Sequence, residues 1–187
     1  MSKNVRIPYP FGIQLGSYMD PWFEIVCNGT GALLKKKKKN MELLEIALSG
    51  RSGLTKNMVY VKGDSLISSN PNCKSIRTRV MSLKGSPFTF SYYNNFFVSF
   101  GCNIIATIEE TDEEIIGCKS RCNTSLINRA PNSGSGFNHC TSSIPFGLQA
   151  FNVDFVSIDK KVLEGCNYAF LSDNSWLEIV ESIKIVD

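Results

Sequence analysis

The stretch GSPFTFSYYNNFFVSFGC, from Gly85 to Cys102, carries the strongest folding signal in the chain. Apolar and polar residues alternate in two successive runs, and a period of two is typical of β-strands. Asn94 and Asn95 lie between the runs, and asparagine tolerates the positive φ that a tight turn requires. The stretch therefore predicts a β-hairpin that ends on a cysteine.

The length of the turn decides which side chains share a face of this hairpin. A two-residue turn would put polar and apolar residues on one face, whereas a three-residue turn, Tyr93 to Asn95, keeps the faces distinct. The favoured register pairs Tyr92 with Phe96, Phe90 with Val98, and Phe88 with Phe100. We expect these aromatic side chains to form a layer of the core rather than a platform on which a ligand stacks.

The composition is that of a globular protein. The chain has 187 residues, of which 43% are hydrophobic and 20% charged. This length corresponds to one domain or at most a small pair, and the apolar content is sufficient for a hydrophobic core.

Seven cysteines indicate an oxidising compartment. Their spacing lacks the paired motifs of a structural zinc site, and His139 is the single histidine, so a disulfide framework is the favoured interpretation. The candidates are Cys27, Cys73, Cys102, Cys118, Cys122, Cys140 and Cys166. Because seven is odd, one thiol is free, is bonded to another chain or has lost its partner. The sequence leaves the connectivity open, including whether Cys118 and Cys122 are bonded to each other.

The start of the chain does not match a secreted protein. It begins Met-Ser-Lys without an apolar signal segment, and no run is long enough to span a bilayer. The chain is therefore expected to be a fragment or to have an incomplete start. Two N-glycosylation sequons, at Asn28 and Asn123, fit secretion.

Short alternating runs bounded by turn signals predict the other strands. They are Trp22–Cys27, Asn40–Ser49, Met58–Lys62, Ile104–Ile108, a long strand leading from Cys140 to Ile158, and Gly165–Leu171. Cys27 and Cys166 are expected to be buried in their strands. The tail from Trp176 to Val186 has a spacing compatible with a short helix. The predicted fold class is mainly β, a disulfide-stapled antiparallel sandwich-like domain with long loops.

Charge is distributed unevenly along the chain. Residues 1–84 hold 14 Lys and Arg against 5 Asp and Glu, a net charge of +9, whereas residues 85–187 hold 6 against 12, a net charge of −6. The basic half suggests an anionic partner, unless the two halves neutralise each other in space. The acidic cluster from Glu109 to Glu114 is expected to be a solvated turn, because it lacks the EF-hand calcium pattern.

Several blocks together resemble a known family. They are NVRIPYPFGI, WFEIVC, LISSNPNC, GSPFTFS followed by FGCN, GCKSRC, CTSSIPFGLQAFNV and GCNYAFL. In this order they are similar to the extracellular galacturonan-binding domain of plant wall-associated receptor kinases. The resemblance covers residues 4–171 and predicts one cysteine-rich ectodomain there, with residues 172–187 as a tail, a linker or a truncated continuation.

The resemblance implies a glycoprotein domain on the cell-wall side of the plasma membrane, joined in its family to a membrane-spanning helix and a kinase. It implies binding of pectin, a galacturonan, without catalysis by the domain itself. The residues themselves indicate neither a cofactor nor a metal site. The chain departs from the family pattern at Ser2-Lys3, at Ser17 and at His139, where family members carry cysteines. It also contains no kinase motif.

Basic side chains are the expected contacts to a polyuronate, because lysine and arginine pair with its regularly spaced carboxylates. The polysaccharide-binding candidates are Lys35, Lys36, Lys37, Lys38, Lys39, Arg77, Arg79 and Lys84. Arg77 and Arg79 share a face if their segment is extended, whereas the lysine run is equally compatible with a solvated loop.

Other functions compete with pectin binding as interpretations of the sequence. The alternative is a protein-binding ectodomain, or a decayed receptor-derived one without carbohydrate affinity. A nucleic-acid partner is disfavoured by the cysteines and the acidic second half. An enzyme is not expected, because neither a Cys–His pair of suitable geometry nor two facing carboxylates is evident.

Overall fold

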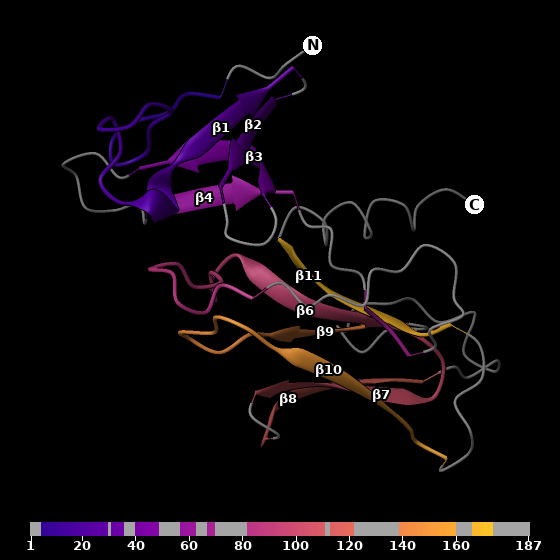
Figure 1. Ribbon diagram of the computed structural model, residues 1–187. Coiled ribbons are helices and arrows are strands. Elements are labelled where there is room, and N and C mark those ends of the chain that lie inside the picture. The colour runs from indigo at the N-terminus through magenta and orange to yellow at the C-terminus, as the bar shows by residue number, and fades with distance from the viewer. Residues whose placement is uncertain are drawn as a thin grey trace. The chain divides into compact units, whose positions relative to one another are not determined.

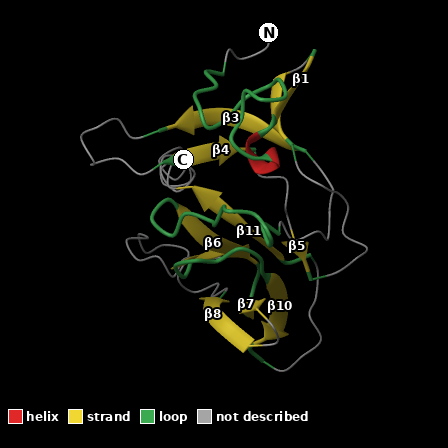
Figure 2. Cartoon of the chain, turned by 60° about the vertical axis from the view of Figure 1, so that its left-hand side comes forward, coloured by secondary structure: helices red, strands yellow, loops and turns green. Residues whose placement is uncertain are grey.

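The structure is a computed structural model that describes residues 5–29, 31–35, 40–48, 57–62, 67–69, 82–110, 113–121, 139–159 and 166–173. The chain divides into two compact units, Met1–Gly63 and Asp64–Asp187. Strands dominate the described part of both units (Figures 1 and 2). The one described helical element is the 3-10 helix η1, Pro21–Phe23, in which the amide of Trp22 donates to the side chain of Asp20.

The first unit contains a four-stranded antiparallel sheet in which sequence neighbours pair. Its order is β1-β2-β3-β4, with bounds Ile25–Asn28, Gly31–Leu34, Met41–Ala47 and Met58–Val61. Buried side chains at alternate positions, such as Leu43 and Ile46 around a bulge in β3, point to one side. The predicted strands Asn40–Ser49 and Met58–Lys62 are thus confirmed, whereas β2 was not predicted.

The proline-aromatic segment at the start of the chain packs against this sheet. Phe11 is buried and meets Phe23 edge to face, with 5.0 Å between ring centroids. The backbone of Gly12 forms a parallel bridge with Glu24, and its carbonyl accepts a hydrogen bond from the amide of Ile25 at 2.8 Å. A Cβ atom at Gly12 would collide with Ser17, so this close approach requires glycine.

The second unit contains two antiparallel sheets. One has the order β10-β7-β8 and the other β5-β11-β6-β9, and Figure 1 shows them as separate layers. The bounds of the first are Asn152–Ser157, Ile104–Glu110 and Glu113–Ser120; those of the second are Ile67–Ser68, Tyr168–Asp173, Asn95–Phe100 and His139–Ser143. Every pairing is antiparallel, so the predicted mainly β, sandwich-like fold is confirmed.

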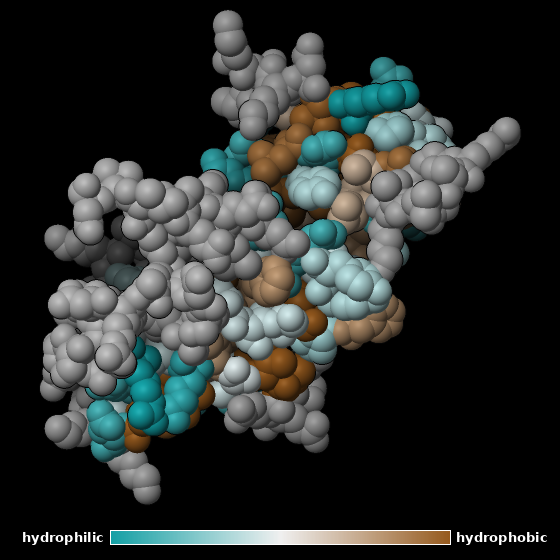
Figure 3. All heavy atoms as spheres, turned by 180° about the vertical axis from the view of Figure 1, so that it is seen from behind, coloured by the Kyte–Doolittle hydropathy of each residue, from teal (hydrophilic) through white to brown (hydrophobic). Residues whose placement is uncertain are grey.

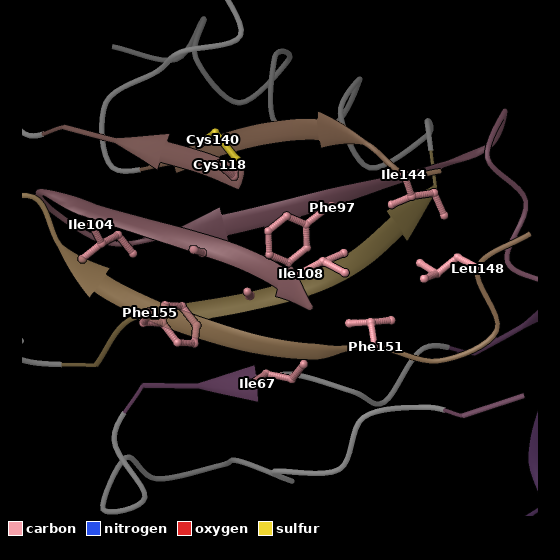
Figure 4. Close-up of a cluster of buried hydrophobic side chains, with 12 residues drawn as sticks. Ile67, Phe97, Ile104, Ile108, Cys118, Cys140, Ile144, Leu148, Phe151 and Phe155 are labelled. Atoms are coloured by element: carbon pink, nitrogen blue, oxygen red, sulfur yellow. A yellow bond between two sulfur atoms is a disulfide. The ribbon is translucent and has the colours of Figure 1, made fainter. Parts of the chain in front are cut away.

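Side chains from both sheets share one hydrophobic cluster. Phe97 of β6 and Ile108 of β7 are fully buried at its centre (Figure 4). Fully burying a side chain of this size contributes about 1.5–3 kcal/mol. The cluster is therefore what joins the two layers into a sandwich.

A disulfide bond crosses this cluster from one sheet to the other. Cys118 of β8 is bonded to Cys140 of β9, with 5.6 Å between their Cα atoms, and both residues are buried (Figure 4). Cys102 and Cys166 are also disulfide-bonded. The disulfide partner of Cys118 is therefore the distant Cys140 and not the neighbouring Cys122.

The predicted hairpin over Gly85–Cys102 is wrong in its first half. Residues 82–94 form turns and loop, and the strand β6 begins at Asn95. Its partners are β11 on one side and β9 on the other, which leaves no edge for a hairpin partner. The favoured register also puts Phe97 on the face opposite the paired aromatic residues, whereas its side chain is fully buried in the core.

The first half of that stretch instead follows the segment before β10. The amide of Leu83 donates to the carbonyl of Gln149 at 2.6 Å, and the amide of Phe90 donates to that of Leu148 at 2.9 Å. The Gln149 carboxamide donates to the carbonyls of Ser86 and Phe88 at 2.9 and 3.0 Å. These bonds satisfy backbone groups that a hairpin would have paired.

Other predicted strands shift in position. The Trp22–Cys27 strand begins later, at Ile25, because η1 precedes it. The long strand expected from Cys140 to Ile158 is interrupted by residues 144–151, which separate β9 from β10. The acidic cluster lies at the β7–β8 connection, with both strands extending into it, to Glu110 and from Glu113.

Two cysteines expected inside the protein are exposed. Cys27 lies beside the β1–β2 turn, beyond the buried part of its strand, and carries a free thiol rather than a disulfide. Cys166 lies just before β11 and is also exposed. The helix considered for Trp176–Val186 lies outside the described residues, and the boundary expected at residue 171 stays a prediction.

Candidate functional site

Lys35 is the one member of the lysine run that the structure describes, and it is engaged within the protein. Its ammonium group contacts both carboxylate oxygens of Glu24, at 2.7 and 2.9 Å, while half of its side chain stays exposed. The hydrogen bond to Glu24 raises the pKa of Lys35 above 10.5. A polyuronate would have to compete with Glu24 for this cation.

Lys84 lies in the second unit, on the loop that precedes Gly85, and it is exposed. The two described binding candidates thus belong to different units of the chain. The remaining candidates lie outside the described residues; they are Lys36, Lys37, Lys38, Lys39, Arg77 and Arg79.

The first sequon lies at an accessible place. Asn28 is exposed at the end of β1, and its side-chain oxygen accepts a hydrogen bond from the amide of Gly31 at 2.9 Å across the turn. Asn123, Cys73 and Cys122 lie outside the described residues.

The first unit also has an open groove of about 780 Å³ between the N-terminal segment and β3. It is lined by Val5, Arg6, Pro8, Leu44, Glu45, Ile46, Ala47 and Leu48. Its charged side chains, Arg6 and Glu45, have opposite signs, so the groove does not favour a polyanion.

Aromatic side chains gather on the surface of the second unit, and only one of them, Tyr92, belongs to the aromatic layer that the sequence predicted for the core. Tyr92 lies 5.2 Å from Phe146 and 3.7 Å from Tyr93, measured between ring centroids. Tyr93 is 54% exposed and Phe146 is 82% exposed. On the face shown in the space-filling view, hydrophobic residues are exposed at the surface between hydrophilic ones (Figure 3).

Metal-binding side chains do not come together in the described part of the chain. No three acidic, histidine or cysteine side chains there are grouped as a metal ion would require. The ring of His139 lies 5.8 Å from that of Phe100, and neighbouring Cys140 is tied into its disulfide. A Cys140–His139 nucleophile pair is therefore excluded.

Comparison with known proteins finds wall-associated receptor kinase-like proteins of Arabidopsis thaliana. Wall-associated receptor kinase-like 4 is 30% identical over 185 residues, which cover 92% of this chain and 24% of that protein. Wall-associated receptor kinase-like 3 is 31% identical over 184 residues, covering 90% and 25%. No family model matches the chain, and no solved structure matches it significantly.

The fold and these matches define the class of the protein as a β-rich, disulfide-bonded domain of the receptor-ectodomain type. Over about nine-tenths of its length the chain is similar to wall-associated receptor kinase-like proteins, and it spans about a quarter of the length of these relatives. The resemblance seen in its sequence blocks is thereby confirmed. Among the described residues no helix has the length and hydrophobicity needed to cross a bilayer.

Proposed function

We propose that this domain lies outside the cell, on the wall side of the plasma membrane, and binds pectin without chemically changing it. The observation that carries the proposal is the similarity over about nine-tenths of the chain to proteins whose name associates them with the wall. The net charge of +9 on residues 1–84 gives that similarity a physical basis, because galacturonan is a polyanion. A membrane anchor and kinase in the parent receptor belong to the same proposal.

We propose that binding is multivalent, with several weak ion pairs between basic side chains and carboxylates of one polymer. An exposed ion pair contributes about 0.2–1 kcal/mol, so one lysine cannot hold a polysaccharide. Several cations that meet carboxylates of the same polymer add their contributions, because the later contacts form intramolecularly. Lys84, Arg77 and Arg79 are proposed as principal contacts, and Lys35 to Lys39 as additional ones.

Retention on an oligogalacturonide column tests this function. We expect the variant with Arg77, Arg79 and Lys84 all changed to glutamine to elute earlier than the unaltered domain. The matched control is Lys119→Gln with Arg121→Gln, which removes exposed cations from β8 and the position after it. Equal retention of all three proteins, or equal losses in both variants, would contradict specific binding through the proposed cations.

Binding of a protein partner is the second candidate, and one surface feature favours it. The loop between Tyr9 and Met19 exposes four large apolar side chains, namely Tyr9, Ile13, Leu15 and Met19, with Leu15 92% exposed. Contiguous exposed apolar surface is typical of interaction sites. Recovery of a defined wall protein without uronic acid, lost in a Leu15→Ser variant, would favour this candidate over pectin.

A further inference from the structure

The surface aromatic cluster of Tyr92, Tyr93 and Phe146 combines contributions from two distant segments. Tyr92 is half-buried and packs against the hydrophobic core, so its ring links the cluster to the interior. Its ring meets that of Phe146 edge to face and contacts the ring of Tyr93, which is tilted by 38°. Single exposed apolar residues are common, whereas contiguous aromatic rings at the surface are a feature of binding surfaces.

Both segments are held in place by hydrogen bonds. The backbone amide and the side-chain amide of Asn95 each donate to the carbonyl of Ser91 at 3.0 Å, which closes the turn that contains Tyr92 and Tyr93. Asn94 donates to the hydroxyl of Ser91 at 3.0 Å in the same turn. Binding at these rings would therefore cost little ordering of the backbone.

Phe146 projects from a similarly fixed loop. The buried side chains of Ile144 and Leu148 anchor the loop on either side of it. Gly147 follows with φ of +82°, a left-handed conformation that reverses the chain between the exposed ring and the buried Leu148. The exposure of Phe146 is thus imposed by the backbone.

The chemistry of the cluster fits the flat side of a sugar ring. One face of a pyranose presents C–H groups, and the electron-rich face of an aromatic ring attracts them, as it attracts the positive edge of another aromatic ring. Tyrosine also offers a hydroxyl that can donate to and accept from sugar hydroxyls at the rim. Rigid tyrosines supply such amphipathic contact area at low entropic cost.

A cation lies on the same pair of segments. Lys84 follows Leu83, whose amide donates to Gln149, and Gln149 is three residues beyond Phe146. The hydrogen bond between Leu83 and Gln149 therefore places the exposed residue Lys84 next to the segment that carries Phe146. This combination matches an acidic polysaccharide better than an uncharged apolar partner.

We propose that Tyr93 and Phe146, supported by Tyr92, form a stacking subsite for the pyranose rings of an acidic wall polysaccharide. The subsite rests on the proposed function, because it takes the same class of ligand, and it adds contacts that do not depend on charge. Stacking supplies geometric selection of the sugar ring, and Lys84 supplies attraction for its carboxylate.

Titration with an oligogalacturonide by calorimetry tests the subsite. We expect Phe146→Ala and Tyr93→Ala each to weaken binding about 3- to 10-fold, with the double variant weaker still. Tyr93→Phe, which keeps the ring, should retain most of the affinity. Leu15→Ala is the matched control, because it removes a similarly exposed apolar side chain from the other unit.

Salt dependence separates stacking from charge pairing. The aromatic variants should lower affinity without changing its dependence on salt, whereas Lys84→Gln should reduce that dependence. If the unaltered domain does not bind the oligogalacturonide, the proposed function and its uronate subsite both fail. If the unaltered domain binds and both aromatic variants bind with the same affinity as that domain, the stacking subsite fails while the proposed function stands. Loss of a protein ligand in the aromatic variants, with oligogalacturonide affinity unchanged, would also overturn the subsite.

Discussion

Two fully buried serines in the second unit differ in whether their hydroxyls are satisfied. Ser120 donates to the carbonyl of Gly101 at 2.7 Å, whereas the hydroxyl of Ser99 has no hydrogen-bond partner in the described part of the chain. Burying an unpaired polar group is unfavourable, while removing one member of a buried pair leaves the other unsatisfied. The two positions therefore form a matched pair.

We expect Ser99→Ala to leave the free energy of unfolding unchanged or raise it by up to about 1 kcal/mol. Ser120→Ala should lower it by about 1–3 kcal/mol, because the carbonyl of Gly101 loses its donor. Urea denaturation of both variants measures the difference. Equal effects at the two positions would show that the Ser99 hydroxyl is satisfied in solution.

Cys27 is the free thiol among the described cysteines, and it is exposed. We expect iodoacetamide to label Cys27 in the native, unreduced protein, because an accessible thiol reacts through its thiolate. Cys102, Cys118, Cys140 and Cys166 should stay unlabelled, since all four are in disulfides. Peptide mapping by mass spectrometry reads out each site, and protection of Cys27 would mean that it pairs with another molecule.

The ion pair of Lys35 with Glu24 sets how much this cation contributes to a ligand. Because its pKa is raised in the folded state, the pairing stabilises the fold below the ordinary pKa of 10.5 and is lost as pH rises through the folded value. Glu24→Gln should return the pKa of Lys35 toward its ordinary value, measured by NMR titration of its side chain. If Lys35 binds uronate, the same variant should bind the oligogalacturonide more tightly; unchanged affinity would exclude Lys35 from the site.

The bond between Cys118 and Cys140 is an element-scale constraint, because it joins β8 of one sheet to β9 of the other. It closes a sequence separation of 22 residues, for which loop-closure entropy gives about 3 kcal/mol. We expect the Cys118→Ala, Cys140→Ala double variant to lose about this much in urea denaturation. Cys27→Ser should change stability little, and a comparable loss there would mean that the effect does not come from the bridge.

The stretch Gly85–Cys102 shows which features of a strand the sequence pattern predicts and which it does not. Alternation correctly predicts that Phe96 to Phe100 is a strand, because a period of two follows from backbone geometry. It does not identify the partner, since β9 and β11 come from far along the chain. Phe97 and Val98 are both fully buried, although adjacent residues of a strand point to opposite faces of the sheet. Alternation therefore could not identify a single core face of β6.

The candidate site was predictable only in part for a related reason. Sequence reasoning identified the charged candidates, because a charged side chain can be recognised from the residue type alone. Lys84 is exposed, as expected. The same reasoning placed Phe90 and Tyr92 in one aromatic face and left Phe146 unconsidered. The contact of Tyr92 with Phe146 joins segments that only the tertiary fold brings together.

The strand β2 was missed for a different reason, because four residues, Gly31 to Leu34, are too few to show a period.

At the scale of the whole molecule, its uneven charge predicts how binding responds to salt. Raising ionic strength from about 0.01 to 0.15 M shortens the Debye length from about 30 to 8 Å, which screens exposed cations from a polyuronate. Because residues 1–84 carry a net charge of +9, we expect oligogalacturonide affinity to fall steeply over this range. A neutral galactan oligomer, which can stack but carries no carboxylates, serves as the control and should bind weakly with little salt dependence. Salt-independent binding of the acidic oligomer would show that charge does not drive recognition, and would leave stacking and hydrogen bonds as its source.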